Sequence, residues 1–322
     1  MTLWSREKPR HIIVLGRKHQ FSDLEKQELS GVFSGILCVK YCERDPLDVI
    51  FEIDNHIKTN DVALLVLNTM EKVDDLIVRY LTKLQFHDMK RKFRVLGVES
   101  FLEKYLKKCY IPDDSGDLSF LENIGPFTKR QYVQKRIIDF FGLFWLFFFG
   151  WPVLLLCILK IKRQSPGDVL YRQERVGYKN KEFVCIKFRS MRMDAEKDGA
   201  QFAKQGDTRV FPWGATMRKT RFDELPQMIN ILKGEMHLIG PRPERRIWTN
   251  EFEKRMPYYA ERHLVRPGVT GLAQVMYPYG ENTEDAKQKL MYDLYYIKYW
   301  SFWLEMKIVW LTALTVIGKR GI

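Results

Sequence analysis

FFGLFWLFFFGWPVLLLCIL, residues 140–159, is the stretch that decides how the rest of this chain can fold. It carries no charged residue, and as a straight helix it would be about 30 Å long, enough to cross the apolar core of a bilayer. The simplest interpretation is a single transmembrane helix. A helix buried in a protein core is the least favoured alternative, because basic residues flank the stretch and Phe and Trp are abundant in it.

Two features favour a helix that enters and leaves the membrane on the same side. Pro152 stands in the middle of the stretch, where proline removes a backbone hydrogen bond and bends a helix. Basic residues stand on both sides, at Lys129, Arg130, Lys135 and Arg136 before the stretch and at Lys160, Lys162 and Arg163 after it. Since Lys and Arg gather on the cytoplasmic side of membranes, both flanks are expected there. The sequence therefore predicts a re-entrant helix over residues 131–160, kinked at Pro152.

The composition points to a negatively charged partner. Among 322 residues, 53 are Lys or Arg and 40 are Asp or Glu, which gives a net charge of +13. Nucleic acid, an anionic lipid surface and phosphorylated substrates all fit this charge. Because basic residues gather beside the apolar stretch, we do not expect nucleic acid. The cysteines include no CxxC pair, which argues against a zinc site, and the N-terminus lacks the apolar run of a secretory signal.

Residues 8–112 are predicted to form a separate α/β domain. Strand-like apolar runs occur at residues 11–16, 36–40, 61–67 and 93–98, and a helical pattern covers 74–86. This alternation predicts a small parallel sheet of Rossmann-like type. The first turn, residues 15–19, lacks the glycine-rich phosphate fingerprint, so an interaction or regulatory role is preferred and nucleotide binding stays open. Residues 113–130 are rich in turn formers and are expected to be a linker.

Residues 161–322 are predicted to form the remaining domain, a mostly α (α+β) one. Near its end, aromatic and basic residues interleave between Tyr292 and Trp310. This pattern favours a pair of amphipathic helices at the membrane interface, with an ordinary aromatic core as the alternative.

Two adjacent carboxylates, Asp223 and Glu224, stand at a predicted helix start that continues to Gly234. Taken alone, Asp at the start, Pro226 in the first turn and Gly at the end are best explained as helix capping. The same place also suits a phosphate, because free N–H groups gather at a helix N-terminus. An ionised Asp is a competent nucleophile toward phosphorus, and its neighbour could hold Mg²⁺ or move a proton.

Basic residues on four further segments make the phosphate interpretation stronger. Prolines fix the backbone around Arg242 in Gly240-Pro241-Arg242-Pro243, and a Pro-Gly turn follows Arg266. Lys187 and Arg189 are predicted on one face of a strand, and Arg218 lies shortly before Asp223. Each could be a solvated structural residue, but together they surround one acidic pair.

Five motifs occur in an order that resembles the bacterial sugar transferases, the monotopic polyprenyl-phosphate sugar-1-phosphate transferases (phosphoglycosyl transferases). They are residues 187–191, 223–227, 240–243, 266–271 and 293–297. The resemblance covers residues 130–322 and includes the apolar stretch. Residues 8–112 resemble the Rossmann-like appendage of larger members, without the bundle of transmembrane helices that precedes it there.

The resemblance implies a phosphotransferase that moves a sugar-1-phosphate from a nucleotide sugar, usually a UDP-sugar, onto undecaprenyl phosphate with Mg²⁺. Asp223 matches the nucleophile that forms a phosphosugar-aspartyl intermediate as UMP leaves, and Glu224 matches its acidic partner and a ligand for Mg²⁺. Matches to positions near the phosphates, metal or nucleotide are Lys187, Arg218, Arg242, Arg266 and Asp293. The implied location is the cytoplasmic leaflet of the bacterial inner membrane. The alternative function is a membrane-anchored scaffold for polysaccharide assembly, without activity. A homodimer is a possible assembly for the enzyme and for the scaffold.

Two departures from the family pattern affect these expectations. Many relatives have Ser before the kink proline, whereas this chain has Trp151. Many also carry Asn-Gly-Arg after the Gln-Val pair, whereas this chain continues as Met276-Tyr277-Pro278-Tyr279-Gly280, which resembles an exopolysaccharide-type subgroup. Contacts to sugar or nucleotide from that Arg are therefore not expected here.

Overall fold

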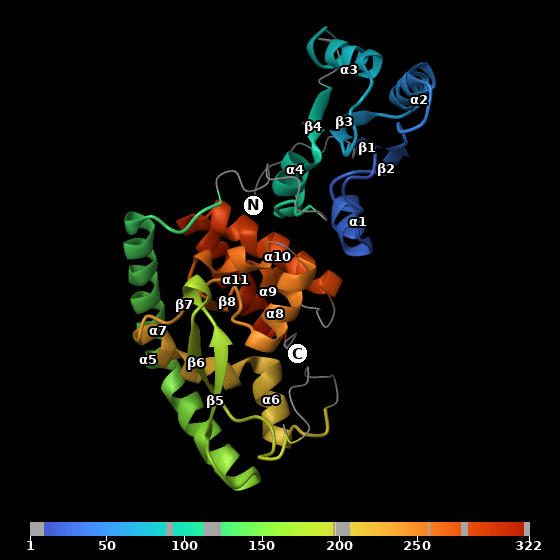
Figure 1. Ribbon diagram of the computed structural model, residues 1–322. Coiled ribbons are helices and arrows are strands. Elements are labelled where there is room, and N and C mark those ends of the chain that lie inside the picture. Colours follow the sequence, from blue (N-terminus) through green and yellow to red (C-terminus); the bar gives the residue numbers. More distant parts are fainter. Residues whose placement is uncertain are drawn as a thin grey trace. The chain divides into compact units, whose positions relative to one another are not determined.

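A computed structural model of the chain describes residues 10–87, 93–112, 124–195, 197, 207–256, 258–277 and 283–318 (Figure 1). The chain divides into two compact units, Met1–Tyr110 and Ile111–Ile322. Most of the expected linker, residues 113–123, lies outside the described residues, as do Pro278, Tyr279 and Gly280 of the departing motif.

The first unit contains a parallel four-stranded sheet in the order β2-β1-β3-β4. Its strands are β1 (His11–Leu15), β2 (Ile36–Val39), β3 (Val62–Leu67) and β4 (Arg94–Gly97). The apolar residues 12–15 of β1 are fully buried, because helices cover both faces of a sheet of this kind. The small parallel sheet predicted from the apolar runs is confirmed.

Helices alternate with these strands because their apolar positions recur at helical spacing. They are α1 (Asp23–Ser30), α2 (Pro46–Thr59), α3 (Asp75–His87), α4 (Val98–Phe101) and a π-helical turn, η1 (Leu102–Leu106). In α2, Val49, Ile53 and Ile57 lie one turn apart and pack into the sheet core. At the start of α1, Ser22 and Glu25 form a capping box that fixes where the helix begins.

The second unit is organised around one long helix, α5 (Lys129–Gln164), which contains the whole apolar stretch. A capping box between Thr128 and Gln131 fixes its start. The helix continues through Pro152, so the expected kink does not interrupt it, although Figure 1 shows a change of direction between its two halves. Its length and hydropathy would allow it to cross a membrane, and 11% of its most apolar window is buried. Whether it re-enters the same leaflet stays a prediction.

Buried polar contacts hold the first half of α5 against the rest of this unit. Nζ of Lys135 donates at 2.7 Å to Glu305, which belongs to α11 (Phe302–Ile317), and at 2.7 Å to the carbonyl oxygen of Ile239. Four residues on, Asp139 accepts from Nδ1 of His237 at 2.6 Å and from the backbone N–H of Leu238 at 2.8 Å. These contacts tie one face of the first half of α5 to the rest of the unit, whereas apolar side chains on its other side, such as Phe140, Phe141 and Phe144, are exposed.

The second half of α5 packs on a hairpin and a short helix. Strands β5 (Leu170–Val176) and β6 (Glu182–Phe188) pair antiparallel, and α6 (Pro212–Thr220) follows them in the chain. Cys157 and Ile161 of α5 share a buried cluster with Phe188 and Met217. The hairpin and α6 carry residues of the candidate site, so this cluster positions the site beside the apolar helix.

Short elements complete the unit around a two-stranded parallel pair. They are η3 (Tyr178–Asn180), η4 (Phe222–Gln227), α7 (Met228–Leu232), β7 (His237–Ile239), α8 (Arg246–Arg255), η5 (Tyr259–Leu264), β8 (Gly268–Thr270), α9 (Leu272–Met276) and α10 (Thr283–Lys298). β7 pairs with β8, and a Cβ atom on Gly268 would overlap the backbone nitrogen of Gly240. The Pro-Gly step after Arg266 therefore leads into a strand rather than forming an isolated turn.

The two aromatic-rich helices near the end differ in their surroundings. In α10, Tyr292 and Tyr296 are fully buried, so this helix belongs to the core and the interfacial interpretation is wrong for these two rings. In α11, the large side chains of Phe302, Trp303 and Trp310 are exposed. α5 also has many exposed apolar side chains, at positions 133, 137, 140, 141, 144, 145, 147–149, 151, 155, 156 and 159. Such an area is typical of membrane contact.

Candidate active site

Glu224 is the centre of a cluster of positive side chains. It lies in η4 with 5% of its surface exposed. Its Oε1 atom accepts hydrogen bonds from Nζ of Lys187 at 3.0 Å and from Nη1 of Arg242 at 2.9 Å. Nη1 of Arg221 lies 3.8 Å from the other oxygen, Oε2. Cations from three segments of the chain therefore converge on one carboxylate.

Each of these segments presents its cation for a local reason. Lys187 is the penultimate residue of β6, and Arg242 follows β7 between Pro241 and Pro243, which restrict the backbone around it. Arg221 joins α6 to η4 with φ +56°, a left-handed conformation that is rare for a residue with a side chain. Strained positions of this kind are concentrated at functional sites.

A buried ion pair supports Arg242 from behind. Nη2 of Arg262 donates to the carbonyl oxygen of Arg242 at 3.0 Å and to Oδ2 of Asp293 at 2.7 Å. Nη1 of Arg262 donates to the hydroxyl of Tyr259 at 2.6 Å. Because both Arg262 and Asp293 are buried, their pairing fixes the backbone that carries Arg242.

The two neighbouring carboxylates have opposite pKa shifts. Burial alone would raise the pKa of Glu224, but Arg242, Lys187 and Arg221 hold it well below its usual range. Burial and the negative charge of Glu224 raise the pKa of Asp223 to about 6, against the opposing effect of Lys187, Arg218 and Arg242. Glu224 is therefore a fixed anion, whereas Asp223 gains a proton just below neutral pH. A carboxylate with a raised pKa is the more basic and the more nucleophilic of the two.

The predicted helix start at Asp223 is wrong in its local geometry. Residues 222–227 form a 3₁₀ helix, and the α-helix begins only at Met228. The N-cap position of η4 is Arg221, which makes no side-chain cap, and the backbone N–H of Glu224 already donates to the carbonyl of Arg221. Asp223 is therefore not placed here to cap a helix. The predicted binding of a phosphate by free N–H groups at a helix start also loses its basis.

Of the predicted site residues, Lys187 and Arg242 contact Glu224, and Arg218 is close enough to Asp223 to lower its pKa. Asp293 instead pairs with Arg262, and Arg262 in turn donates to the carbonyl oxygen of Arg242. Asp293 therefore acts on the site indirectly. Arg189 does not share a face with Lys187, because its guanidinium is buried against Ser165 and the carbonyl of Asp168. β6 ends at Phe188, and the chain turns there.

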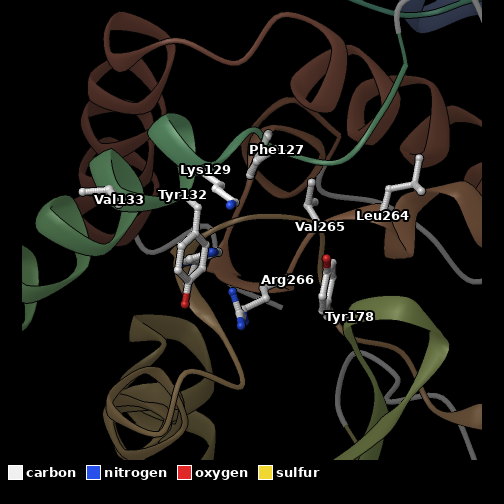
Figure 2. Close-up of a pocket in the computed structure, with 9 residues that line it drawn as sticks. Phe127, Lys129, Tyr132, Val133, Tyr178, Leu264, Val265 and Arg266 are labelled. Atoms are coloured by element: carbon white, nitrogen blue, oxygen red, sulfur yellow. The ribbon is translucent and has the colours of Figure 1, made fainter.

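Arg266 lies apart from the acidic pair. Its guanidinium carbon is 4.6 Å from the ring centre of Tyr132 and 5.3 Å from that of Tyr178. These residues line a hollow of about 480 Å³, together with Lys129 and His237 (Figure 2). Among the described residues that line it, none belongs to the cluster around Glu224.

The donor set fits a Mg²⁺ ion that is held mainly by substrate. Oε2 of Glu224 is buried and accepts no hydrogen bond, so it could act as a metal ligand, with Asp223 next to it. The described part of the chain contains no cluster of three or more acidic, His or Cys side chains arranged for a metal. Mg²⁺ is commonly bound by one or two carboxylates plus substrate phosphates, and this donor set matches that mode.

Comparison of the sequence with models of known protein families shows which family this chain is related to. The model described as bacterial sugar transferase matches residues 130–319, more than half of the chain. The chain belongs to the bacterial sugar transferase family. The match begins at the start of α5 and ends after α11, so it includes the apolar helix and all of the candidate site.

Curated relatives of this sugar transferase carry out one kind of reaction, according to their names. A UDP-N-acetylgalactosamine-undecaprenyl-phosphate N-acetylgalactosaminephosphotransferase of Aeromonas hydrophila is 48% identical over 53% of the chain and 40% of its own length. A UDP-glucose:undecaprenyl-phosphate glucose-1-phosphate transferase of Xanthomonas campestris pv. campestris is 40% identical over 60% of the chain and 40% of its own length. A transferase of the same name from Caulobacter vibrioides is 40% identical over 55% of the chain and 67% of its own length. The sugar transferase thus aligns with less than half of the first two relatives.

Sequence reasoning missed two arginines of the sugar transferase's site. Arg221 directly precedes Phe222 and the acidic pair, and its closeness in sequence was a signal that could have been used. Arg262 had no local signal, because its role depends on a carboxylate and a carbonyl that are distant in sequence.

Proposed function

We propose that this bacterial sugar transferase moves a sugar-1-phosphate from a UDP-sugar to undecaprenyl phosphate, through a covalent intermediate on Asp223. The observation that carries the proposal is the pair of opposite carboxylates: Glu224 fixed by Lys187 and Arg242, and Asp223 with a raised pKa beside it. The relatives' names supply the substrate classes.

In the first step, an oxygen of the Asp223 carboxylate attacks the phosphorus that bears the sugar. The bond between that phosphorus and the bridging oxygen breaks, and UMP leaves with the electron pair. In the second step, a phosphate oxygen of the lipid attacks the same phosphorus and releases the Asp223 carboxylate. The sugar is left on a lipid diphosphate, and two displacements at one phosphorus make the reaction a ping-pong one.

The cations of the site have a role in both displacements. Charge builds up on the phosphoryl oxygens as each transition state forms, and fixed cations stabilise that charge without reorganising. Arg242 is braced through its carbonyl by Arg262, and Lys187 lies on a strand, so both are positioned before substrate arrives. Asp223 and Oε2 of Glu224 would hold Mg²⁺, which supplies charge neutralisation to the substrate phosphates when bound.

The membrane setting follows from the same elements. Phe222 and Leu225, on either side of the acidic pair, pack against the core that contains Cys157 of α5. A nucleophile beside an apolar helix can meet a lipid phosphate at the bilayer surface. We propose that α5 is re-entrant and that the protein stays on the cytoplasmic leaflet.

A UMP-release screen tests the proposed reaction. Purified protein is incubated with Mg²⁺, undecaprenyl phosphate and a panel of nucleotide sugars that includes UDP-N-acetylgalactosamine and UDP-glucose. We expect UMP to appear with at least one UDP-sugar and to stop when Mg²⁺ is chelated. Absence of UMP across the panel would favour an inactive scaffold instead.

The rate of UMP release is expected to fall as the pH is lowered through about 6. Asp223 has a pKa raised to about 6, and only its ionised form, which is lost as the pH falls, can attack phosphorus. A pH–rate profile from pH 5 to 8 measures this limb. In a Glu224→Gln variant the limb of any residual activity should move to lower pH, because a neighbouring negative charge is gone. A Glu174→Gln control, at an exposed carboxylate of β5, should leave it in place; an identical limb in both variants would contradict the assignment.

The topology of α5 has its own test. In a background where the exposed Cys38 and Cys42 are replaced by Ser, single cysteines are introduced at Arg130 and Lys162, one at each end of the helix. A membrane-impermeant maleimide applied to intact spheroplasts should label neither position, and both should react after lysis. Labelling of one position in intact spheroplasts would mean that the helix spans the membrane.

A further inference from the structure

The hollow around Arg266 is a second candidate site in the sugar transferase. We propose that it binds the phosphate headgroup of an anionic phospholipid, such as phosphatidylglycerol, whose acyl chains lie along the exposed apolar face of α5. The hollow, of about 480 Å³, is formed at the N-terminal end of α5, where Lys129 and Tyr132 face η3 and the segment before β8 (Figure 2). This inference is independent of the proposed reaction.

Two cations in this hollow have no acidic partner in the part of the chain that the structure describes. The guanidinium of Arg266 lies between the rings of Tyr132 and Tyr178, and Lys129 extends toward the same space (Figure 2). In the described residues, neither Arg266 nor Lys129 forms an ion pair. By contrast, Glu224 holds the cations of the acidic cluster. Two positioned cations without a carboxylate are suited to an anionic ligand that comes from outside the chain.

Apart from the two cations, two tyrosine rings and His237, the lining of the hollow is apolar. Phe127, Val133, Leu264 and Val265 contribute to its walls. A small hydrophilic anion gains nothing from such walls, whereas an amphiphile uses both the cations and the apolar surface. The chemistry of the lining therefore favours a lipid phosphate over free phosphate.

An exposed apolar path leads away from the hollow along α5. It begins at Val133, which lines the hollow, and continues on the same side of the helix at the exposed positions 137, 140, 141, 144 and 148. These positions recur at three- and four-residue spacing, so they form one stripe. An acyl chain that extends from a headgroup at Lys129 can follow this stripe.

The lipid proposed here is distinct from the acceptor of the proposed reaction, because none of the described residues that line the hollow belongs to the cluster around Glu224. The residues next to the acidic pair, Phe222 and Leu225, pack against the core that contains Cys157. The hollow instead lies at the N-terminal end of α5, so a phosphate bound by Lys129 and Arg266 fixes how that end of the helix sits in the leaflet.

Native mass spectrometry of the full chain, released from detergent micelles that contain phosphatidylglycerol or phosphatidylcholine, tests the proposal. We expect a one-to-one adduct with phosphatidylglycerol and little retention of phosphatidylcholine. Lys129→Gln should weaken retention about fivefold, and the double variant with Arg266→Gln should weaken it further, because each basic residue near an anionic surface contributes to binding. Arg130→Gln is the matched control: this exposed cation is adjacent to Lys129 and does not line the hollow.

The results of this experiment distinguish a specific lipid-binding site from non-specific electrostatic attraction. Equal loss of adduct in Lys129→Gln and Arg130→Gln would overturn the proposal, since non-specific attraction depends only on charge. Displacement of phosphatidylglycerol by equimolar undecaprenyl phosphate would assign the hollow to the acceptor and overturn it as well. Displacement by an equal concentration of inorganic phosphate would overturn the proposal too, because the apolar walls would then contribute nothing to binding. Lys129 lies exposed at the first position of α5, so its replacement tests the site without endangering the fold.

Discussion

An Asp223→Asn variant is expected to release UMP from UDP-sugars at least about a thousandfold more slowly than the wild type, with or without lipid acceptor. The amide has the same shape as the carboxylate but cannot form the acyl-phosphate bond, and loss of a nucleophile removes nearly all of the rate that depends on it. Timed UMP release under saturating UDP-sugar measures the effect. Because the loss precedes the second displacement, adding undecaprenyl phosphate should not restore it.

The matched control for this variant is Asp168→Asn. Asp168 is exposed in the loop before β5, and the hydrogen bond that the structure gives it uses its backbone carbonyl. The control should retain wild-type turnover. Full turnover by Asp223→Asn would exclude Asp223 as the nucleophile and leave Glu224 as the remaining carboxylate of the pair.

An Arg262→Met variant is expected to lower the free energy of unfolding by about 3–5 kcal/mol, because it leaves the buried Asp293 carboxylate without its partner. For a unit of this size that loss corresponds to a fall of roughly 10 °C in melting temperature. Thermal unfolding followed by circular dichroism in detergent measures it. Activity should fall too, since the carbonyl of Arg242 loses a hydrogen bond that positions its guanidinium.

A double variant separates the two effects of Arg262. Replacing the pair by Arg262→Met with Asp293→Leu removes both buried charges and should recover most of the lost stability. It should not recover the activity, because Arg242 remains without its support. If the double variant is as unstable as the single one, the ion pair is not the source of the loss. If activity returns with stability, Arg262 has no positioning role.

Much of the fold was predictable because its signals are local. The strands of the first unit follow continuous apolar runs, and the structure places β1, β2, β3 and β4 on them. α5 follows from an uncharged run of helical length. The acidic pair and the cations Lys187 and Arg242 could be found because motifs, each only a few residues long, carry them in a fixed order.

The parts that sequence reasoning missed depend on contacts between distant segments. Asp293 is near the site only through Arg262, and a pattern along the chain cannot show which cation a buried carboxylate meets. Tyr296 resembles an interfacial tyrosine in sequence, yet Lys135 and Glu305 enclose it in the core. The 3₁₀ turn at Asp223 was mistaken for an α-helix start, because Pro226 is compatible with both.

Trapping the covalent intermediate tests the central claim most directly. Purified protein is mixed with Mg²⁺ and a UDP-sugar without lipid acceptor, quenched, and examined by intact-protein and peptide mass spectrometry. We predict that a fraction of the protein gains the mass of one sugar phosphate on the peptide that contains Asp223, and that undecaprenyl phosphate removes it. Turnover with lipid acceptor but without such an adduct in the wild type, or an adduct that persists in Asp223→Asn, would contradict the account.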